Sequence, residues 1–219
     1  MIRIKPTLDG SNTLYVPSID EHYHSTNGAI QESRHVFIEN GYMQCNSNPV
    51  QVFEMGFGTG LNALLTLERS IIENRIVEYH SVEKYPLEKR IWEKVDYGSL
   101  FGKRCEKYYS LMHNCNWDIK CKLSNNFTLL KMKKDIRDMQ SGEPYDLIYF
   151  DAFAPGKQAE LWTFDVLSFI ASITKRHGIF ITYSSKGQLK RDLAKLGFEV
   201  FHPDGPPGKR QITRAVKMI

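Results

Sequence analysis

VQVFEMGFGTG, residues 50–60, joins a run of mostly apolar residues to a turn that contains three glycines. The apolar run predicts a buried strand, and leucines at helical spacing after the turn predict a helix. Glycines at such a junction let the backbone turn sharply and approach a ligand with no Cβ in the way. A strand, a glycine-rich turn and a helix in this order are typical of a doubly wound α/β sheet.

Strand-like and helix-like segments alternate along the rest of the chain. Strands are expected at 76–83, 145–150 and 178–183, and helices from Pro86, over 160–173 and over 187–196. The runs 119–124 and 127–132 flank Asn125-Asn126 and predict an inserted hairpin. Only a turn separates the last two strand-like runs, 198–201 and 212–218, so an antiparallel strand pair should end the sheet. The alternation predicts a mostly parallel α/β sheet with helices on both faces.

Acidic residues near the ends of the strands indicate the ligand. The pattern E-x-G-x-G-x-G differs from the G-x-G-x-x-G of dinucleotide binders, and Glu54 suits the cationic amino-acid end of S-adenosylmethionine better than a pyrophosphate. Glu83 could accept hydrogen bonds from ribose hydroxyls, and Asp135 could receive the adenine amino group or serve as a helix N-cap. We therefore expect S-adenosylmethionine as cofactor. Its expected contacts are Glu54, Gly56, Phe57, Gly58, Gly60, Asn62, Glu83, Lys84, Asp135 and Ile136.

Asp151 directly follows the strand-like run 145–150. Ligands of doubly wound sheets bind at the carboxyl ends of the strands, so this carboxylate should lie beside the sulfonium group of the cofactor. A turn or capping role is the alternative for an acid in this position. We expect Asp151 to be the catalytic residue.

A resemblance to a known family becomes specific at this point. DAFAPGKQAELWT (151–163) resembles a signature of the methyltransferase half of the bifunctional tRNA 5-methylaminomethyl-2-thiouridine biosynthesis proteins, the MnmC family, and of its stand-alone relatives. The same family is matched in order by HYHSTNGAIQESRHVFIENG (22–41), VFEMGFGTGLNAL (52–64), SVEKYPL (81–87), TYSSKG (182–187) and GPPGKRQITRA (205–215). The resemblance covers nearly the whole chain. The sequence departs from the bifunctional members in one respect. It shows no second glycine motif, and its length leaves no room for their flavin oxidase domain, so no flavin domain is expected in this chain.

The resemblance implies a class I S-adenosylmethionine-dependent methyltransferase fold, which is Rossmann-like and ends in an antiparallel strand pair. Residues 50–219 would form this domain, and the polar, irregular residues 1–49, with a short helix at 29–40, would extend over the acceptor side. The implied reaction is N-methylation of the 5-aminomethyl group of wobble uridine in tRNA, giving 5-methylaminomethyl(-2-thio)uridine. Asp151 would bind and orient the amine, and the proton would leave to it or to water.

The same resemblance suggests residues of the acceptor side, although each could instead be an ordinary surface or core residue. Pocket-lining candidates are Tyr23, His24, Gln31 and Glu32, with Tyr183 and Ser184 closing the acceptor side. Phe153 and Trp162 could stack on a base, although core packing is the more ordinary role. The candidates for contacts with tRNA phosphates are Lys157, Lys186, Lys209 and Arg210.

Composition sets the remaining limits. The 219 residues are 42% hydrophobic and carry a net charge of +4, which permits a nucleic-acid partner without requiring one. No apolar run approaches the roughly 20 residues of a membrane span, and the start of the chain lacks the apolar core of a signal peptide. We expect a cytoplasmic protein with no membrane partner. The four cysteines form no C-x-x-C pair, so we expect no metal site and free, buried or partly buried thiols.

Three other functions stay open on the residues alone. A nucleotide-sugar or NAD-dependent oxidoreductase would need the G-x-G-x-x-G spacing that is absent here, and it would bind NAD tightly. A catalytically silent tRNA-binding protein would not bind S-adenosylmethionine. A methyltransferase of the same fold that acts on a small-molecule amine would keep its activity after RNase treatment of the substrate pool.

Overall fold

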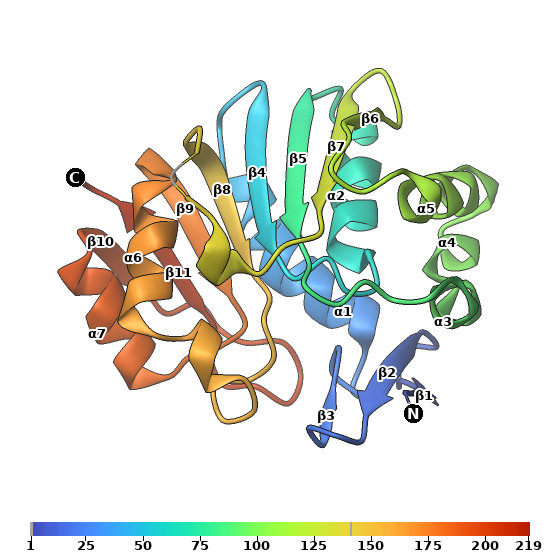
Figure 1. The fold of residues 1–219 in the computed structure, drawn as a ribbon, viewed down its shortest axis with the longest axis horizontal. Helices are drawn as coiled ribbons and strands as arrows, with labels where there is room; N and C mark the ends of the chain where they lie inside the picture. Colours follow the sequence, from blue (N-terminus) through green and yellow to red (C-terminus); the bar gives the residue numbers. More distant parts are fainter. Residues whose placement is uncertain (1, 141) are drawn as a thin grey trace.

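An eight-stranded sheet forms the centre of the molecule (Figure 1). The computed structural model describes residues 2–140 and 142–219. In sheet order the strands are β10 (Phe198–Phe201), β11 (Thr213–Lys217), β9 (Thr174–Thr182), β8 (Tyr145–Phe150), β4 (Val50–Met55), β5 (Val77–Val82), β7 (Phe127–Met132) and β6 (Cys121–Lys122). The five inner strands from β9 to β7 run parallel, whereas β11 and β10 at one edge and β6 at the other are antiparallel to their neighbours. The predicted α/β class, the terminal antiparallel pair and the inserted hairpin are confirmed.

Helices cover both faces of this sheet, so its central strands are buried on both sides. One face packs on α1 (Ala29–Ser33), the π-helix Arg34–Glu39 that continues it, and α2 (Leu61–Ile72). The other face packs on α6 (Phe164–Ser172) and α7 (Gly187–Lys195), which lie together in Figure 1. Each face has its own cluster of buried apolar side chains, and the carboxyl ends of the strands stay free to hold a site.

The N-terminal segment is more regular than expected. It forms a second, three-stranded antiparallel sheet from β1 (Arg3–Pro6), β2 (Asn12–Val16) and β3 (Glu21–His22). Buried Leu14 packs into the main core, which explains why these short strands are stable beside it. The prediction of an irregular segment was wrong because the strands are too short and polar to show a clear alternation.

Two predicted helix starts are also corrected. Pro86 does not open a helix, because α3 (Lys89–Val95) begins only after Glu88. The helix expected over 160–173 begins at Phe164, where the Thr163 side chain accepts a hydrogen bond from the amide of Val166 and caps it. The short α4 (Tyr97–Leu100) and the longer α5 (Lys103–Asn114) follow α3 and were not anticipated.

The expectation of four free thiols is wrong for two of them. Cys115 and Cys121 form a disulfide between the end of α5 and the start of β6, whereas Cys45 and Cys105 are free and buried. A search for C-x-x-C pairs misses cysteines that meet only when the chain turns back onto the sheet edge. Trp117 lies inside the closed loop and packs edge-on against Phe57 of the glycine turn, with ring centroids 6.0 Å apart.

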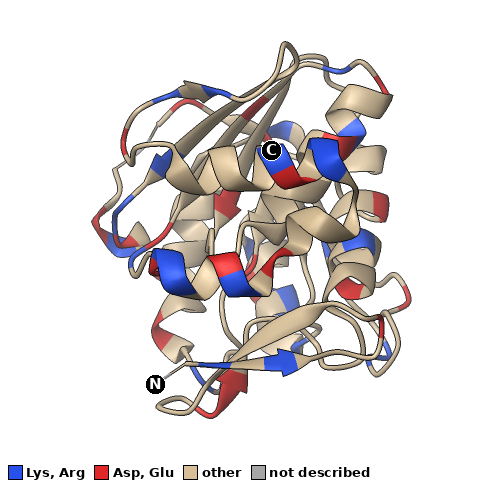
Figure 2. Ribbon diagram, turned by 90° about the vertical axis from the view of Figure 1, so that its right-hand side faces the viewer, with Lys and Arg blue, Asp and Glu red and all other residues tan. Residues whose placement is uncertain are grey.

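Charge and hydropathy give two further observations. Figure 2 looks onto the side that carries α3 to α5, where Lys and Arg are interspersed with Asp and Glu. Within residues 2–140 and 142–219, none of the helices combines the length and the apolarity needed to cross a bilayer.

Candidate active site

A cavity of about 460 Å³ opens at the carboxyl ends of β4, β5, β7 and β8. The residues that follow these strands form one half of its wall, and residues 21–26 of the N-terminal segment, with α1, form part of the other. Figure 1 shows the small sheet of β1 to β3 lying beyond these strand ends. Parallel strands bring their C-terminal residues to one edge, which is why acids far apart in sequence meet here.

The glycine turn after β4 leaves little space for a side chain at Gly56 and Gly58. Gly56 has a φ of 93°, and a Cβ there would lie 2.7 Å from the backbone oxygen of Asp151. Gly58 has a φ of 49°, and its Cβ would lie 3.1 Å from the ring of Tyr23. Both glycines line the cavity and have no Cβ, so the backbone of the turn can approach a ligand closely, while the Gly56 amide donates to the backbone oxygen of Val82.

Asn62, in the first turn of α2, joins two carboxyl groups. Its Nδ2 donates to Glu54 Oε1 at 3.1 Å and to Asp151 Oδ2 at 2.8 Å. Its Oδ1 is buried and accepts from none of the described residues. Because Nδ2 is held by both acids, the amide cannot turn over, and Oδ1 is an acceptor available to a ligand.

The two acids that Asn62 joins differ in access to the cavity. Glu54 is fully buried beneath the turn, where Ser81 Oγ also donates to it at 2.7 Å, and it does not line the cavity. Burial raises the pKa of Glu54 well above its usual range. Asp151 lines the cavity, and burial raises its pKa to about 7, while the Asn62 hydrogen bond acts in the opposite direction. Asp151 can therefore exchange a proton near neutral pH.

Glu83 and Asp135 line the part of the cavity where the ribose and adenine of S-adenosylmethionine are expected. Glu83 accepts from the amides of Gly58 at 3.1 Å and Tyr85 at 2.8 Å, and burial raises the pKa of Glu83. Asp135 caps a short 3₁₀ helix by accepting from the amide of Arg137. The Arg137 guanidinium, which pairs with the same carboxylate, holds the pKa of Asp135 well below its usual range. The capping role proposed for Asp135 is confirmed.

Three aromatic rings line the cavity beside Asp151, and one of them, Tyr23, also faces Gly58 of the turn. Tyr23 and Phe153 meet edge to face with centroids 5.0 Å apart, and the Tyr183 hydroxyl donates to the backbone oxygen of Ala152 at 2.7 Å. All three rings line the cavity. His24 also lines it, and its Nε2 lies 2.8 Å from Thr59 Oγ1. Because burial lowers the pKa of His24 to about 4, its imidazole is neutral at pH 7.

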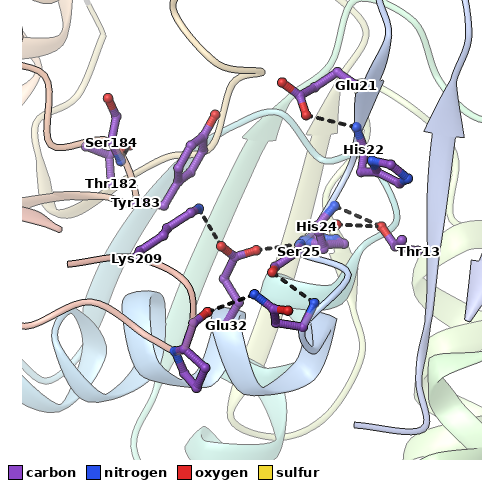
Figure 3. A network of polar contacts seen from close by, with 12 residues as sticks. Thr13, Glu21, His22, His24, Ser25, Glu32, Thr182, Tyr183, Ser184 and Lys209 are labelled. Atoms are coloured by element: carbon purple, nitrogen blue, oxygen red, sulfur yellow. Dashed lines mark hydrogen bonds and ion pairs between the residues drawn. The ribbon is translucent and has the colours of Figure 1, made fainter. Parts of the chain in front are cut away.

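A partly buried ion pair lies beneath the Tyr183 ring, as Figure 3 shows. The Lys209 ammonium donates to Glu32 Oε1, and Glu32 Oε2 accepts from the amide of Ser25 at 2.7 Å. The same ammonium lies 4.0 Å from the centroid of the Tyr183 ring. Lys209 therefore lies in the cavity wall, with a third of its side chain exposed, and its expected contact with a tRNA phosphate stays a prediction.

The structure brings most of the expected residues together. Of the residues expected to contact S-adenosylmethionine, the cavity is lined by Gly56, Phe57, Gly58, Asn62, Glu83, Lys84, Asp135 and Ile136. Of the other expected site residues, it is lined by Tyr23, His24, Glu32, Asp151, Phe153 and Lys209. The expected residues absent from its lining are Glu54, Gly60, Gln31, Lys157, Trp162, Ser184, Lys186 and Arg210.

Three of the residues outside the lining have structural roles. Gly60 precedes α2 with a φ of 73°, and Ser184 is buried, with its carbonyl oxygen accepting from Thr213. Trp162 packs against Phe150 and donates to the backbone of Phe153, as the core-packing alternative predicted.

Three basic residues lie on the surface around the loops that border the cavity. Lys157 forms an ion pair with Asp20 at 3.3 Å and so ties the loop after β8 to the N-terminal segment. Lys186 precedes α7, and Lys186 and Arg210 are exposed.

Sequence reasoning missed Arg137, Lys134, Tyr85 and Gln158, which also line the cavity. Gln158 Oε1 accepts from the amide of Phe153 at 3.3 Å and holds the loop after β8. The signal for the first three was their position one to two residues from Glu83 or Asp135. In the part of the chain that the structure describes, no cluster of three His, Cys, Asp or Glu side chains could hold a metal ion.

Comparison with known proteins identifies the class of enzyme. Residues 100–218 match the S-adenosyl-L-methionine-dependent methyltransferase family. The chain belongs to this family. The methyltransferase is also similar to the tRNA 5-methylaminomethyl-2-thiouridine biosynthesis bifunctional protein MnmC of Burkholderia multivorans, with 30% identity over 217 residues. That match covers 90% of this chain and 32% of the relative, so the methyltransferase spans about a third of that protein's length.

Solved structures agree with this assignment. MNMC2 from Aquifex aeolicus has a TM-score of 0.78 to the methyltransferase at 26% identity, and the match covers 98% of this chain and 70% of that one. Spermidine synthase from Thermotoga maritima has a TM-score of 0.59 at 14% identity, covering 99% of this chain and 68% of that one, which shows the fold alone. The resemblance found in the sequence and the class I fold are confirmed.

Proposed function

We propose that this methyltransferase transfers a methyl group from S-adenosylmethionine to the primary amine of a 5-aminomethyl group on wobble uridine in tRNA. The product would be 5-methylaminomethyl(-2-thio)uridine. The observation that carries the proposal is Asp151, a carboxyl group whose pKa is raised to about 7 and whose backbone closes directly over Gly56. It therefore lies where the cofactor half of the cavity meets the aromatic half. The names of the MnmC relatives support the choice of acceptor.

The residues present fit S-adenosylmethionine. The glycine turn is a cradle that a Cβ would fill, and Asn62 Oδ1 is a buried acceptor without a partner among the described residues. We assign the amino-acid end of the cofactor to the turn and Asn62, the ribose to Glu83, and the adenine to the neighbourhood of Asp135 and Ile136. When bound, the cofactor supplies an electrophilic methyl group on a positively charged sulfur.

Asp151 addresses the main chemical obstacle, which is protonation of the acceptor. An alkylamine has a pKa near ~10.4, so roughly one molecule in a thousand or fewer is neutral at pH 7. An ionised Asp151 can bind the ammonium, orient it and accept its proton, because the two groups then compete for that proton in a site largely withdrawn from water. Asn62 holds Asp151 in place at 2.8 Å, which favours a near-attack geometry.

The remaining residues have supporting roles in this proposal. Residues 1–49 serve the acceptor side through Tyr23, His24 and Glu32, while residues 50–219 carry the cofactor half. The exposed Lys186 and Arg210, with Lys157, contact tRNA phosphates outside the cavity. A tRNA substrate also implies that the protein works in the cytoplasm.

Mass spectrometry of wobble nucleosides tests the proposal directly. We expect cells that lack the gene to lose the methylaminomethyl nucleoside and to accumulate its aminomethyl precursor. The purified protein with S-adenosylmethionine should then convert the precursor in tRNA from those cells. Unchanged nucleosides in those cells, or conversion that survives RNase treatment of the tRNA, would contradict the tRNA assignment.

A further inference from the structure

Lys209 is a half-buried cation, with 33% of its side chain exposed, that retains capacity to bind a ligand. An ammonium has three N–H donors and no acceptor, and only Glu32 accepts a hydrogen bond from it among the described residues. The Tyr183 ring face attracts the charge without using a lone pair. Lys209 lines the cavity, so its remaining donors can serve a group that enters there.

The position of this ammonium is fixed from two sides. The amide of Lys209 donates to the backbone oxygen of Pro206 at 2.9 Å, which closes the turn that carries the lysine. On the other side, the Glu32 side chain is only 9% exposed and is itself held by the Ser25 amide. A charge held in this way by the Glu32 carboxylate and the Tyr183 ring can discriminate between hydrogen-bond donors and acceptors, because its position relative to the cavity is defined.

The acceptor end also contains the features of a slot for one planar base. Tyr23, Phe153 and Tyr183 supply aromatic surface, and Asp151 and Lys209 line the same cavity. Burial dominates the raised pKa of Asp151, and the Lys209 charge acts on it in the opposite direction. Enzymes that modify a base commonly stack it on aromatic rings and read its edge by hydrogen bonds.

We propose that Lys209 reads the 4-carbonyl oxygen of the acceptor pyrimidine and that Glu32 is the residue that positions Lys209. This inference rests on the proposed function. Carbon 4 adjoins carbon 5, so a base whose 5-aminomethyl group reaches Asp151 presents its 4-substituent to the neighbouring part of the wall. Uracil has a carbonyl acceptor there, whereas cytosine has an amino donor. Cytosine would therefore place a donor against the ammonium.

The test compares two anticodon stem-loops that differ only in the base that carries the aminomethyl group, 5-aminomethyluridine or 5-aminomethylcytidine. A well-placed contact to a base edge is worth about 10- to 100-fold in discrimination, so wild-type kcat/KM should favour uridine by about that factor. Lys209→Met should lose most of this preference. The matched control is Lys195→Met, at an exposed lysine of α7, which should keep the preference.

Two further variants keep the test decisive if Lys209→Met does not fold. Lys209→Gln offers both an amide donor and an amide oxygen, so it should accept cytidine better than the wild type does. Glu32→Gln keeps the size of the side chain and releases the ammonium, so it should reduce the preference as well. Calorimetric binding of S-adenosylmethionine, which uses the other half of the cavity, checks that each variant is folded.

The outcomes separate this inference from the proposed function. Equal use of both stem-loops by the wild type, or an undiminished preference in folded Lys209→Met or Lys209→Gln, overturns the role of Lys209 and leaves the proposed function intact. Failure of the wild type to methylate the uridine stem-loop overturns both. A preference that falls in the Lys209 variants and persists in Lys195→Met supports the inference.

Discussion

Replacing Asp151 by asparagine should abolish most of the activity and at the same time stabilise the protein. The variant keeps an oxygen that can accept from Asn62 Nδ2, so the geometry of the loop after β8 should persist. It removes the group that accepts the proton of the amine. General-base catalysis contributes about 10²- to 10⁴-fold, so kcat should fall by about that factor. The dissociation constant for S-adenosylmethionine should change little, since the other cofactor contacts are retained.

The stability change follows from the raised pKa of Asp151. The carboxyl pKa rises from an ordinary 3.8 to about 7 on folding because burial disfavours the charged form. The native state therefore holds a proton that the unfolded state releases between these values, and the stability that this provides is present below about pH 4 and is lost as pH rises through 7. The difference corresponds to at most roughly 4 kcal/mol above pH 7. Asparagine cannot ionise, so the variant should avoid that loss.

Two assays measure these effects. The first assay follows methyl transfer to a 5-aminomethyluridine stem-loop from pH 5.5 to 9, which is roughly the range in which a group of pKa about 7 titrates. The wild-type rate should rise through pH 7, and the variant rate should lack that step. Urea unfolding should show the variant to be more stable than the wild type at pH 8, with the gap closing toward pH 4. The control Glu199→Gln, at an exposed acid of β10, should change neither quantity. Normal turnover of Asp151→Asn would refute the assignment of Asp151, and a variant less stable than the wild type at pH 8 would refute the electrostatic argument.

Three further predictions follow from the structure. Gly56→Ala should weaken binding of S-adenosylmethionine at least about 10-fold by calorimetry, because the new Cβ would lie 2.7 Å from the backbone oxygen of Asp151. The control Gly10→Ala, at a glycine with a φ of 83° and open space around it, should leave the affinity unchanged. Tyr183→Phe should lower the free energy of unfolding by about 1 kcal/mol through the loss of one hydrogen bond, measured in urea, and an unchanged value would show that bond to be unimportant. Leu147→Ala, at a fully buried position of β8, should cost about 2–5 kcal/mol in the same assay, and a cost below 1 kcal/mol would mean that the core there is loosely packed.

Local sequence determined the main sheet and most of the cofactor half of the site. The run from Val50 to Gly60 specifies strand, turn and helix through apolar periodicity and glycine content, which act over a few neighbouring residues. Glu83 and Asp151 could be placed because a parallel sheet brings every strand end to one edge. Their joint position in one cavity is therefore a consequence of topology that the alternation of segments already implies.

Only the tertiary structure decided the features that depend on distant partners. Glu32 and Lys209 are 177 residues apart, and nothing in either local pattern shows that they form an ion pair or that Lys209 points inward. Among the described residues, Asn62 likewise leaves its Oδ1 without a partner only because Glu54 and Asp151 together hold its Nδ2. The disulfide between Cys115 and Cys121 needs the turn from α5 onto the sheet edge. Such contacts depend on the packing of whole elements, whereas local patterns record only which elements form and which face each one buries.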